Sequence, residues 1–360
     1  MMKNTMKNPK SSNGIFPFGC RITALLLVLL TLLFVLTPVF IPKSYGVWAT
    51  TAVMDGFYEL EEDSIEVLFL GSSQIMTAVS PMQLYEETGI TSYNLGTEQQ
   101  NLVTSYFLLK EALQYQKPKV VVLDVFFLYP YYSDSALNSK EEFVRKAFDY
   151  MKWSPNKLEA VRTICSLDNR HELKNYFFPF LRFHSRWSDL SLSDFTYLFR
   201  DKANPLKGFS IATEKEALDF QGFTFTDSTK AAAPLETMEQ YFEKIVSLCE
   251  ENNISLVLIK TPRGNGSFGE DYHNGIQTLA DKHALPFLDF NEKSLFDKIA
   301  FDASTDYLDV SHVNYYGAEK ITAYLSAYLN AAFPLEDRRS TPAYSSWQND
   351  LQLYLEIIPK

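Results

Sequence analysis

Two short stretches of the sequence carry side chains that could activate one another for nucleophilic attack. Ser73 closes the triplet Gly71-Ser72-Ser73, which follows directly on the mostly apolar residues 65–70. Far along the chain, Asp309 and His312 lie three positions apart. A serine hydroxyl attacks an acyl carbon only when a base removes its proton, and an imidazole that serves as this base is oriented by an acceptor. The residue types therefore predict Ser73 as nucleophile, His312 as base and Asp309 as orienting acid.

Both stretches also have an interpretation without chemistry. A Gly-Ser-Ser triplet can be a tight turn with a helix cap, and Asp309 can cap a helix beside a structural histidine. The chain has only five histidines. The Asp309–His312 pair stands on one turn before a predicted helix, and it favours catalysis over the structural interpretation.

Alternating strands and helices would position these residues. We expect strands at residues 64–71, 90–96, 118–127, 253–262 and 285–291. We expect helices at residues 80–89, 98–116, 235–251 and 269–283, and a turn with a closing helix within 309–329. The run 118–127 is apolar on both faces, as parallel strands between helix layers are. The pattern predicts an α/β fold, with a parallel sheet, helices on both faces and right-handed crossovers.

The candidate residues fall at one edge of this predicted sheet. Ligands of open parallel sheets bind at the carboxyl ends of the strands. The triplet with Ser73 ends the first predicted strand, Asn94-Leu95-Gly96 ends the second, and Asp124 lies near the end of the third. A serine at a strand-to-helix turn also presents a backbone N–H near a helix start, where negative charge is stabilised. We therefore expect the functional site at this edge.

The N-terminus predicts a membrane anchor. Residues 22–41 are uncharged and span about 30 Å as a helix, which matches one hydrocarbon core. Basic residues precede this run and acidic residues follow it, so the positive-inside rule places residues 1–21 in the cytoplasm and the chain after the anchor (22–42) outside. A cleaved signal peptide is the alternative. Its apolar region is normally shorter and is followed by a small-x-small site, which favours the retained anchor.

The remaining chain predicts one large domain with two additions. The α/β domain covers residues 50–333, and residues 334–360 form a C-terminal appendage. Residues 128–232 break the alternation and predict a mainly helical insertion, with a loop or hairpin at 203–232. The aromatic clusters 126–132 and 176–187 have three interpretations: the insertion's own core, which is favoured, contact with the membrane surface, or stacking on sugars.

Composition excludes several classes of function. The chain has 360 residues and a net charge of -11, which argues against nucleic acid as a partner. Cys20, Cys165 and Cys249 show no metal or disulfide spacing, and a Cys165–Cys249 bridge has no support from the sequence. The sequence contains no phosphate-binding loop and no metal-ligand spacing, so we expect neither a metal nor a cofactor.

The motifs resemble one known superfamily. The segments FLGSSQ, YNLGTEQQN, KVVVLDVF and DVSHVNYYGAEK occur in the order and spacing of the SGNH (GDSL-like) hydrolases, and the D-x-x-H-x-N-x-x-G pattern is the most specific of them. The resemblance covers the α/β core without the insertion and implies a flavodoxin-like three-layer fold. The anchor and the Gly-Ser-Ser variant resemble the cell-envelope branch, which contains the D-alanine transfer protein of teichoic acids and the alginate O-acetylation proteins.

The resemblance also implies roles for individual residues. Ser73 matches the nucleophile, His312 the base and Asp309 its orienting acid. Gly96 matches the glycine whose backbone N–H, together with that of Ser73, faces the oxyanion. No cofactor is implied.

Two positions depart from the family pattern. Ser72 replaces the aspartate of the first block, and the Gly-x-Asn-Asp of the third block is absent, with Asp124 near its place. An ionised aspartate cannot donate to an oxyanion, and the loss of one such donor costs about 3 kcal/mol. Candidates for a replacement donor are Gln99, Gln100, Asn101 and Arg263. Asp124 is either buried and bonded to the backbone, which is favoured, or takes a direct role.

We therefore expect a membrane-anchored serine esterase or O-acyltransferase that acts outside the cell on acetyl or D-alanyl esters of an envelope polymer. The expected partners are an envelope polysaccharide or teichoic-acid-like polymer, the membrane and a membrane-bound O-acyltransferase. Arg263, Asn101 and Asp124 are candidate substrate-binding residues, and Arg263 could hold an anionic group. The alternatives are a catalytically inactive SGNH-like scaffold or polysaccharide-binding module, and a peptidase or lipase.

Overall fold

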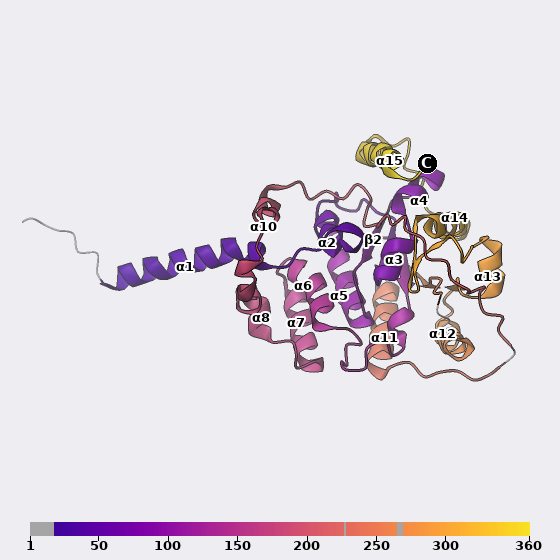
Figure 1. The fold of residues 1–360 in the computed structure, drawn as a ribbon, viewed down its shortest axis with the longest axis horizontal. Coiled ribbons are helices and arrows are strands. Elements are labelled where there is room, and N and C mark those ends of the chain that lie inside the picture. The colour runs from indigo at the N-terminus through magenta and orange to yellow at the C-terminus, as the bar shows by residue number, and fades with distance from the viewer. Residues whose placement is uncertain (1–17, 227, 265–268) are drawn as a thin grey trace, which may run out of the picture. The chain divides into compact units, whose positions relative to one another are not determined.

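The computed structural model describes residues 18–226, 228–264 and 269–360. These residues form two compact units. The first contains the described residues up to Ile41 together with Phe178–Phe199, and the second contains Pro42–Phe177 and Arg200–Lys360. Figure 1 shows the elements of both units, and each unit is described by itself.

A five-stranded parallel sheet forms the centre of the second unit. Its strand order is β2-β1-β3-β4-β5. The strands are β1 (Val67–Gly71), β2 (Ser92–Gly96), β3 (Val120–Asp124), β4 (Ser255–Lys260) and β5 (Phe287–Asp289). The register pairs Gly71 with Gly96 and Leu70 with Leu123, so the first three strands end at the same edge. This order has its switch point between β1 and β3, where ligands of such sheets bind.

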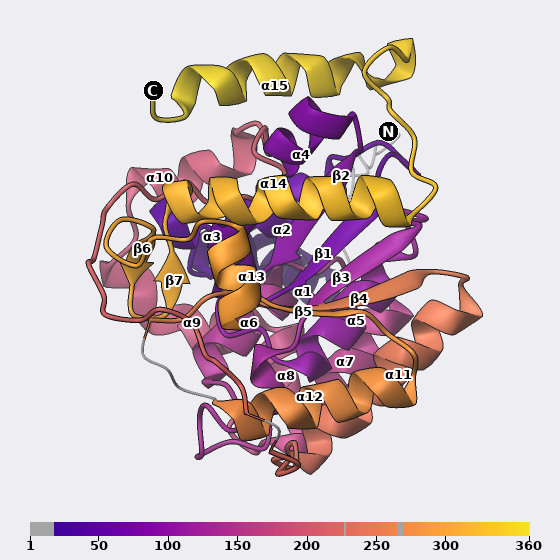
Figure 2. The ribbon, with the colours of Figure 1, turned by 90° about the vertical axis from the view of Figure 1, so that its right-hand side faces the viewer.

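Helices cover both faces of the sheet. They are α2 (Thr50–Tyr58), α3 (Ser73–Ala78), α4 (Pro81–Thr88), α5 (Leu102–Ala112), α11 (Glu236–Glu251), α12 (Glu270–Lys282), α13 (Lys293–Lys298) and α14 (Tyr315–Ala332), and a further helix, α15 (Ser345–Ile357), follows them. Figure 2 shows α14 on one side of the sheet and α5 and α11 on the other. The predicted α/β fold class, with a parallel sheet and helices on both faces, is confirmed.

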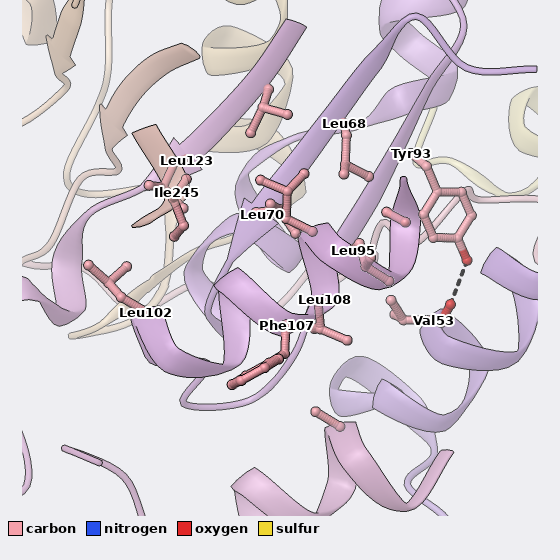
Figure 3. Close-up of a cluster of buried hydrophobic side chains, with 14 of the residues drawn as sticks. Val53, Leu68, Leu70, Tyr93, Leu95, Leu102, Phe107, Leu108, Leu123 and Ile245 are labelled. Carbon is pink, nitrogen blue, oxygen red and sulfur yellow. Dashed lines mark hydrogen bonds between the residues drawn. The ribbon is translucent and has the colours of Figure 1, made fainter. Parts of the chain in front are cut away.

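Alternate residues of the strands face two different cores. Leu68 and Leu70 of β1 lie in a cluster with α5 and α11, whereas Val67 and Phe69 lie in a cluster with α14. Figure 3 shows the first cluster, in which the Tyr93 hydroxyl also donates a hydrogen bond to the Val53 carbonyl at 2.7 Å. Because both faces are covered, the strands need apolar residues at every position, and this explains why they read as continuous apolar runs.

The predicted strands and helices are longer than the observed ones. The predicted strand 118–127 ends at Asp124, because the chain turns there into a 3₁₀-helix, η2 (Phe126–Leu128). The predicted helix 98–116 begins at Leu102, because the Asn101 side chain accepts a hydrogen bond from the Thr104 N–H at 2.9 Å and caps it. The end of α4 is as sharp as its sequence suggests, because Gly89 adopts φ 78°.

The insertion extends the core of the sheet. It contains α6 (Glu141–Tyr150), α7 (Pro155–Leu167) and α8 (Leu173–Phe177). Tyr129, Phe148 and Tyr176 are buried in the same cluster as Leu68 of β1. Tyr129 and Tyr176 belong to the aromatic clusters 126–132 and 176–187, so their place in this shared core differs from the expected separate core of the insertion. Residues 203–226 and 228–232 contain no hairpin, and Phe223 forms one isolated parallel bridge with Glu292.

The C-terminal segment packs on α4. The Trp347 ring of α15 lies 5.5 Å from the Tyr85 ring, centroid to centroid, and Trp347 and Tyr354 are buried. Lys207 forms an ion pair with Asp350 of α15. Cys20, Cys165 and Cys249 are free thiols.

The first unit consists of α1 (Phe18–Phe40), α9 (Pro179–Phe183) and α10 (Leu192–Thr196), with the 3₁₀-helices η3 (His184–Ser188) and η4 (Tyr197–Phe199). Gly19–Phe40 is long and apolar enough to cross a membrane, as a membrane anchor or a signal sequence is. At its end, the Phe40 ring lies 4.9 Å from the Phe180 ring, and Arg186 Nη1 donates to the Phe40 carbonyl at 2.5 Å. The second part of the insertion therefore packs on the end of α1.

Candidate active site

The turn after β1 gives the two adjacent serines, Ser72 and Ser73, different surroundings. Gly71 passes so close to β3 that a Cβ added to it would lie 2.4 Å from the Asp124 Cβ, which only glycine avoids. Ser72 is buried, and its Oγ accepts a hydrogen bond from the Gln74 N–H at 3.3 Å, so it caps α3. Ser73 is the first residue of α3 and is half-buried. The geometry thus gives Ser72 a structural position and leaves Ser73 accessible.

Ser73, His312 and Asp309 form a continuous hydrogen-bonded chain. Ser73 Oγ lies 2.9 Å from His312 Nε2, and His312 Nδ1 lies 2.9 and 3.0 Å from the two carboxylate oxygens of Asp309. A carboxylate can only accept, so Nδ1 carries the proton, Nε2 accepts, and the Ser73 hydroxyl donates. This is the proton path that nucleophilic serine chemistry needs.

A short hairpin fixes the imidazole and the carboxylate. Its strands are β6 (Tyr307–Asp309) and β7 (His312–Val313), which pair antiparallel. Asp309 Oδ1 also accepts from the Ser311 N–H at 2.7 Å and the His312 N–H at 3.0 Å. Burial opposes the charge of Asp309, but the hydrogen bond from His312 and these backbone N–H groups outweigh burial and lower its pKa. Asp309 is therefore held ionised against the imidazole.

The Asn and Gly of the same motif hold the start of α14. Asn314 Oδ1 accepts from the backbone N–H groups of Tyr316 and Gly317 at 3.0 and 3.2 Å. A Cβ added to Gly317 would lie 2.5 Å from the Asp306 carbonyl oxygen. These residues let α14 approach the hairpin closely. They therefore help to position His312 beside Ser73.

A small cavity opens onto the serine and the histidine. Its volume is about 160 Å³. Its lining consists of Trp48, Ser72, Ser73, Gln74, Glu98, Gln99, Phe126, Phe127, Tyr131, Phe143, Arg263, Ser311 and His312. The Trp48 ring packs on the His312 ring at a centroid distance of 4.6 Å. Sequence reasoning missed Trp48, whose only signal is an aromatic residue shortly after the apolar N-terminal segment.

Asp124 lies beneath the cavity. It is buried, and its carboxylate accepts from the Ser72 Oγ–H and the Phe126 N–H, both at 3.0 Å. Burial raises its pKa, and the hydrogen bonds from Phe126 and Ser72 offset this effect only in part. Asp124 thus has the buried, hydrogen-bonded position that was favoured for it.

We expect the free energy of unfolding of an Asp124→Asn variant to lack the pH dependence that the Asp124 carboxyl group gives the wild type. Because the folded state raises this pKa, the wild type is most stable below the ordinary aspartate pKa and loses stability as pH rises through the folded value. Every tenfold change in proton affinity contributes about 1.4 kcal/mol to this fall. Thermal unfolding midpoints of both proteins between pH 3.5 and 8 should diverge, with the variant gaining relative to the wild type. Parallel curves would contradict the assignment, whereas a constant offset reports only the altered bond to Ser72.

The four candidate replacement donors have different surroundings. Gln100 Nε2 donates to Ser105 Oγ at 3.1 Å, and Asn101 is fully buried as the cap of α5, so neither faces the cavity. Gln99 and Arg263 both line it. Gln99 has φ 48°, and its Nε2 makes no hydrogen bond within the described part of the chain.

Gly96 lies at the end of β2 and is buried. Among the described residues it does not line the cavity, whereas Glu98 and Gln99 of the same loop do. A role of the Gly96 N–H toward an oxyanion stays a prediction.

No protein-family model matches the sequence, and no curated protein matches it. A structure provisionally described as a lipolytic protein of the G-D-S-L family from Desulfitobacterium hafniense is similar at 14% identity, over 73% of this chain and 98% of that chain, with a TM-score of 0.36. A structure provisionally described as an acylhydrolase from Bacteroides fragilis is similar at 12% identity, over 80% of this chain and 99% of that chain, with a TM-score of 0.36. The chain itself has an α/β fold with a five-stranded parallel sheet, in which Ser73 begins α3 two residues after the end of β1 and His312 lies three residues before the start of α14.

Proposed function

We propose that this protein is a membrane-anchored serine esterase or O-acyltransferase that acts outside the cytoplasm. The observation that carries this proposal is the hydrogen-bonded chain Ser73–His312–Asp309 at the mouth of a cavity. Ser73 and the Asp309–His312 pair, which are distant in sequence, converge in an arrangement that activates a serine.

The proposed reaction runs in two halves. Ser73 Oγ attacks the acyl carbon while His312 Nε2 takes the hydroxyl proton, and Asp309 stabilises the resulting imidazolium. His312 then gives this proton to the leaving alkoxide as the C–O bond breaks, which leaves an acyl-serine. Water or a polymer hydroxyl attacks the acyl-serine, with His312 again taking and returning one proton. Water gives hydrolysis, and a polymer hydroxyl gives acyl transfer.

The size of the cavity supports a short acyl group. An engineered protein cavity of about 150 Å³ holds one benzene molecule, and the cavity beside Ser73 has about 160 Å³. An acetyl or D-alanyl group fits this volume, whereas a long acyl chain would have to extend out of the cavity into solvent. This favours acetyl or D-alanyl esters over lipids. The envelope polysaccharide or teichoic-acid-like acceptor, and a membrane-bound O-acyltransferase as acyl donor, rest on the family resemblance alone.

The packing within the first unit supports a retained anchor. The segment Phe178–Phe199 uses Phe180 and Arg186 to contact the end of α1, and cleavage of α1 would remove these partners. Large apolar side chains of the same segment stay exposed, including Trp187 (74%), Leu192 (78%) and Phe199 (88%), as is typical of segments at a membrane interface. Retention of the full-length chain in membranes after an alkaline wash is expected, and its release would contradict the anchor.

The second candidate is an SGNH-like scaffold without activity. Asp124 at the place of the family's Asn favours it, because an oxyanion donor is missing and one donor is worth about 100-fold or more in rate. The Nε2 of Gln99 is our proposed substitute. A non-glycine residue with φ 48° is uncommon, and such backbones cluster at functional sites.

Ester hydrolysis by the full-length protein in detergent distinguishes the two candidates. We expect release of acid from acetyl and alanyl esters, including O-acetylated polysaccharide, and we expect the rate to fall steeply for chains of about eight carbons or more because of the cavity volume. A folded protein that releases no acid from any ester, and that takes no label from a fluorophosphonate probe, would support the scaffold. Faster cleavage of long-chain esters or of peptides would support a lipase or a peptidase.

A further inference from the structure

Arg263 is a buried cation in the lining of the catalytic cavity. It follows β4, and its backbone N–H donates to Asn291 Oδ1 at 2.8 Å, which fixes the position of the turn. The residue is only 4% exposed. The guanidinium carbon lies 4.4 Å from the centre of the Phe126 ring, and Nη2 donates to Ser311 Oγ at 2.6 Å. The guanidinium thus lies between the end of β3 and the hairpin that carries His312.

This guanidinium has no counter-charge in direct contact. Arg263 forms no ion pair with any residue that the structure describes, and its Nε is buried without a hydrogen-bond partner. Asp124 and Asp309 act on it only through longer-range attraction. Glu98, the acidic residue in the lining, is paired with Lys146 at 2.5 Å. A buried charge that lacks a partner is costly, so a ligand of opposite charge would be stabilised beside it.

A purely structural role explains only part of this arrangement. The bond to Ser311 and the contact with the Phe126 ring would hold the hairpin in place, but neither uses the Nε–H of the guanidinium. Arginine presents its donors in a planar fork that matches carboxylate and phosphate oxygens. Arg263 lines the cavity and its Nε–H lacks an acceptor among the described residues, so an anion bound beside it would supply the missing acceptor.

We infer that Arg263 forms an anion subsite for the alcohol half of the ester, and that the natural substrate carries a phosphate or carboxylate group there. This inference rests on the proposed function. The assignment to the alcohol half follows from position, because Arg263 bonds to Ser311, the neighbour of His312. His312 must protonate the leaving alkoxide, so the alcohol half lies on the histidine side of Ser73.

Two matched acetate esters test the charge preference directly. Methyl 4-acetoxybenzoate and 4-acetoxybenzoate share the acetyl group and differ by one negative charge on the alcohol half; 4-acetoxyphenyl phosphate gives the phosphate arm. The readout is the ratio of kcat/KM for the anionic ester to that for the neutral ester. We expect a ratio of about 10 or more in the wild type, as a charge-assisted hydrogen bond provides. The larger of the carboxylate and phosphate ratios identifies the anion.

Variants assign this preference to Arg263. Arg263→Met should bring the ratio to about 1, and Arg263→Lys should keep part of it, because lysine retains the charge without the fork. The ratio cancels any general loss caused by the altered bond to Ser311. Arg162→Met, which removes an exposed arginine of α7, should keep the wild-type ratio. An equal ratio in the wild type and in Arg263→Met would overturn the subsite, and a preference for a charge on the acyl half would overturn its assignment to the alcohol half.

A binding measurement keeps the test independent of activity. Inorganic phosphate or 4-hydroxybenzoate should raise the thermal midpoint of the wild type and should leave that of Arg263→Met unchanged. If no ester is hydrolysed but this shift appears, the proposed reaction fails and the anion subsite stands. If esters are hydrolysed but neither anion shifts the midpoint and the ratio is near 1, the reaction stands and the subsite fails.

Discussion

Ser73→Ala is expected to reduce kcat for short-chain ester hydrolysis by about 10⁴-fold or more. The reason is chemical, because alanine leaves His312 without a hydroxyl to deprotonate, and no covalent intermediate can form. The remaining rate would come from binding and from the backbone donors around the cavity alone. The measurement is kcat on an aryl acetate, together with labelling of full-length protein by a fluorophosphonate probe, which Ser73→Ala should abolish.

Ser72→Ala provides the matched control for the site of labelling. Ser72 is buried, caps α3 and donates to Asp124, so its loss should cost about 1 kcal/mol of stability. We expect this variant to take the label on Ser73, at a reduced rate if α3 frays. Label that persists in Ser73→Ala and disappears in Ser72→Ala would reverse the roles of the two serines.

The sequence predicts the sheet well because its strands are buried between two layers of helices. Buried parallel strands must be apolar on both faces, so β1, β3 and β4 appear as unbroken apolar runs. Their carboxyl ends share one edge, which is why a serine after β1 could be assigned to a site before any geometry was known. The ends of the elements are harder to predict, because caps such as that of Asn101 shorten the helices relative to their apolar pattern.

Spacing alone does not identify the acid–base pair. Asp168 and His171 have the same separation as Asp309 and His312. In the structure, Asp168 pairs with Arg170 at 2.5 Å, and His171 Nδ1 lies 2.7 Å from the Tyr176 hydroxyl in a buried network. Burial lowers the pKa of His171 to about 4, so it stays neutral. What distinguishes His312 is a serine within hydrogen-bonding distance, which depends on contacts between residues 239 positions apart.

Other parts of the site depend on tertiary contacts that local patterns do not contain. The hairpin strands β6 and β7 are too short to show a period. Trp48 reaches His312 from the segment after α1, and Arg263 reaches the hairpin from the end of β4. Asn101 was a candidate for substrate binding from its position in the loop, yet its side chain is fully buried as a cap. Only the folded chain distinguishes a polar side chain that caps a helix from one that lines a cavity.

Asp309→Asn is expected to lower kcat by about 10⁴-fold with little loss of stability. An asparagine can keep the hydrogen bonds that Oδ1 accepts from the Ser311 and His312 N–H groups. It removes the negative charge that holds the proton on His312 Nδ1, so the tautomer with Nε2 free to accept is no longer favoured. The measurements are kcat on an aryl acetate and the thermal unfolding midpoint.

Asp309→Ala distinguishes the catalytic role of the Asp309 charge from the structural role of its side-chain oxygen in the hairpin turn. It should lose activity to a similar extent and should also lose stability, by about 1–3 kcal/mol, because the Ser311 and His312 N–H groups lose their acceptor. If Asp309→Asn kept more than about one tenth of the wild-type kcat, the carboxylate would serve the hairpin only, and the ionised state favoured by its lowered pKa would have no part in the reaction. If Asp309→Asn is inactive but as stable as the wild type, and Asp309→Ala is destabilised, then the carboxylate has two separate roles. Its charge orients the base, and its oxygen holds the hairpin together.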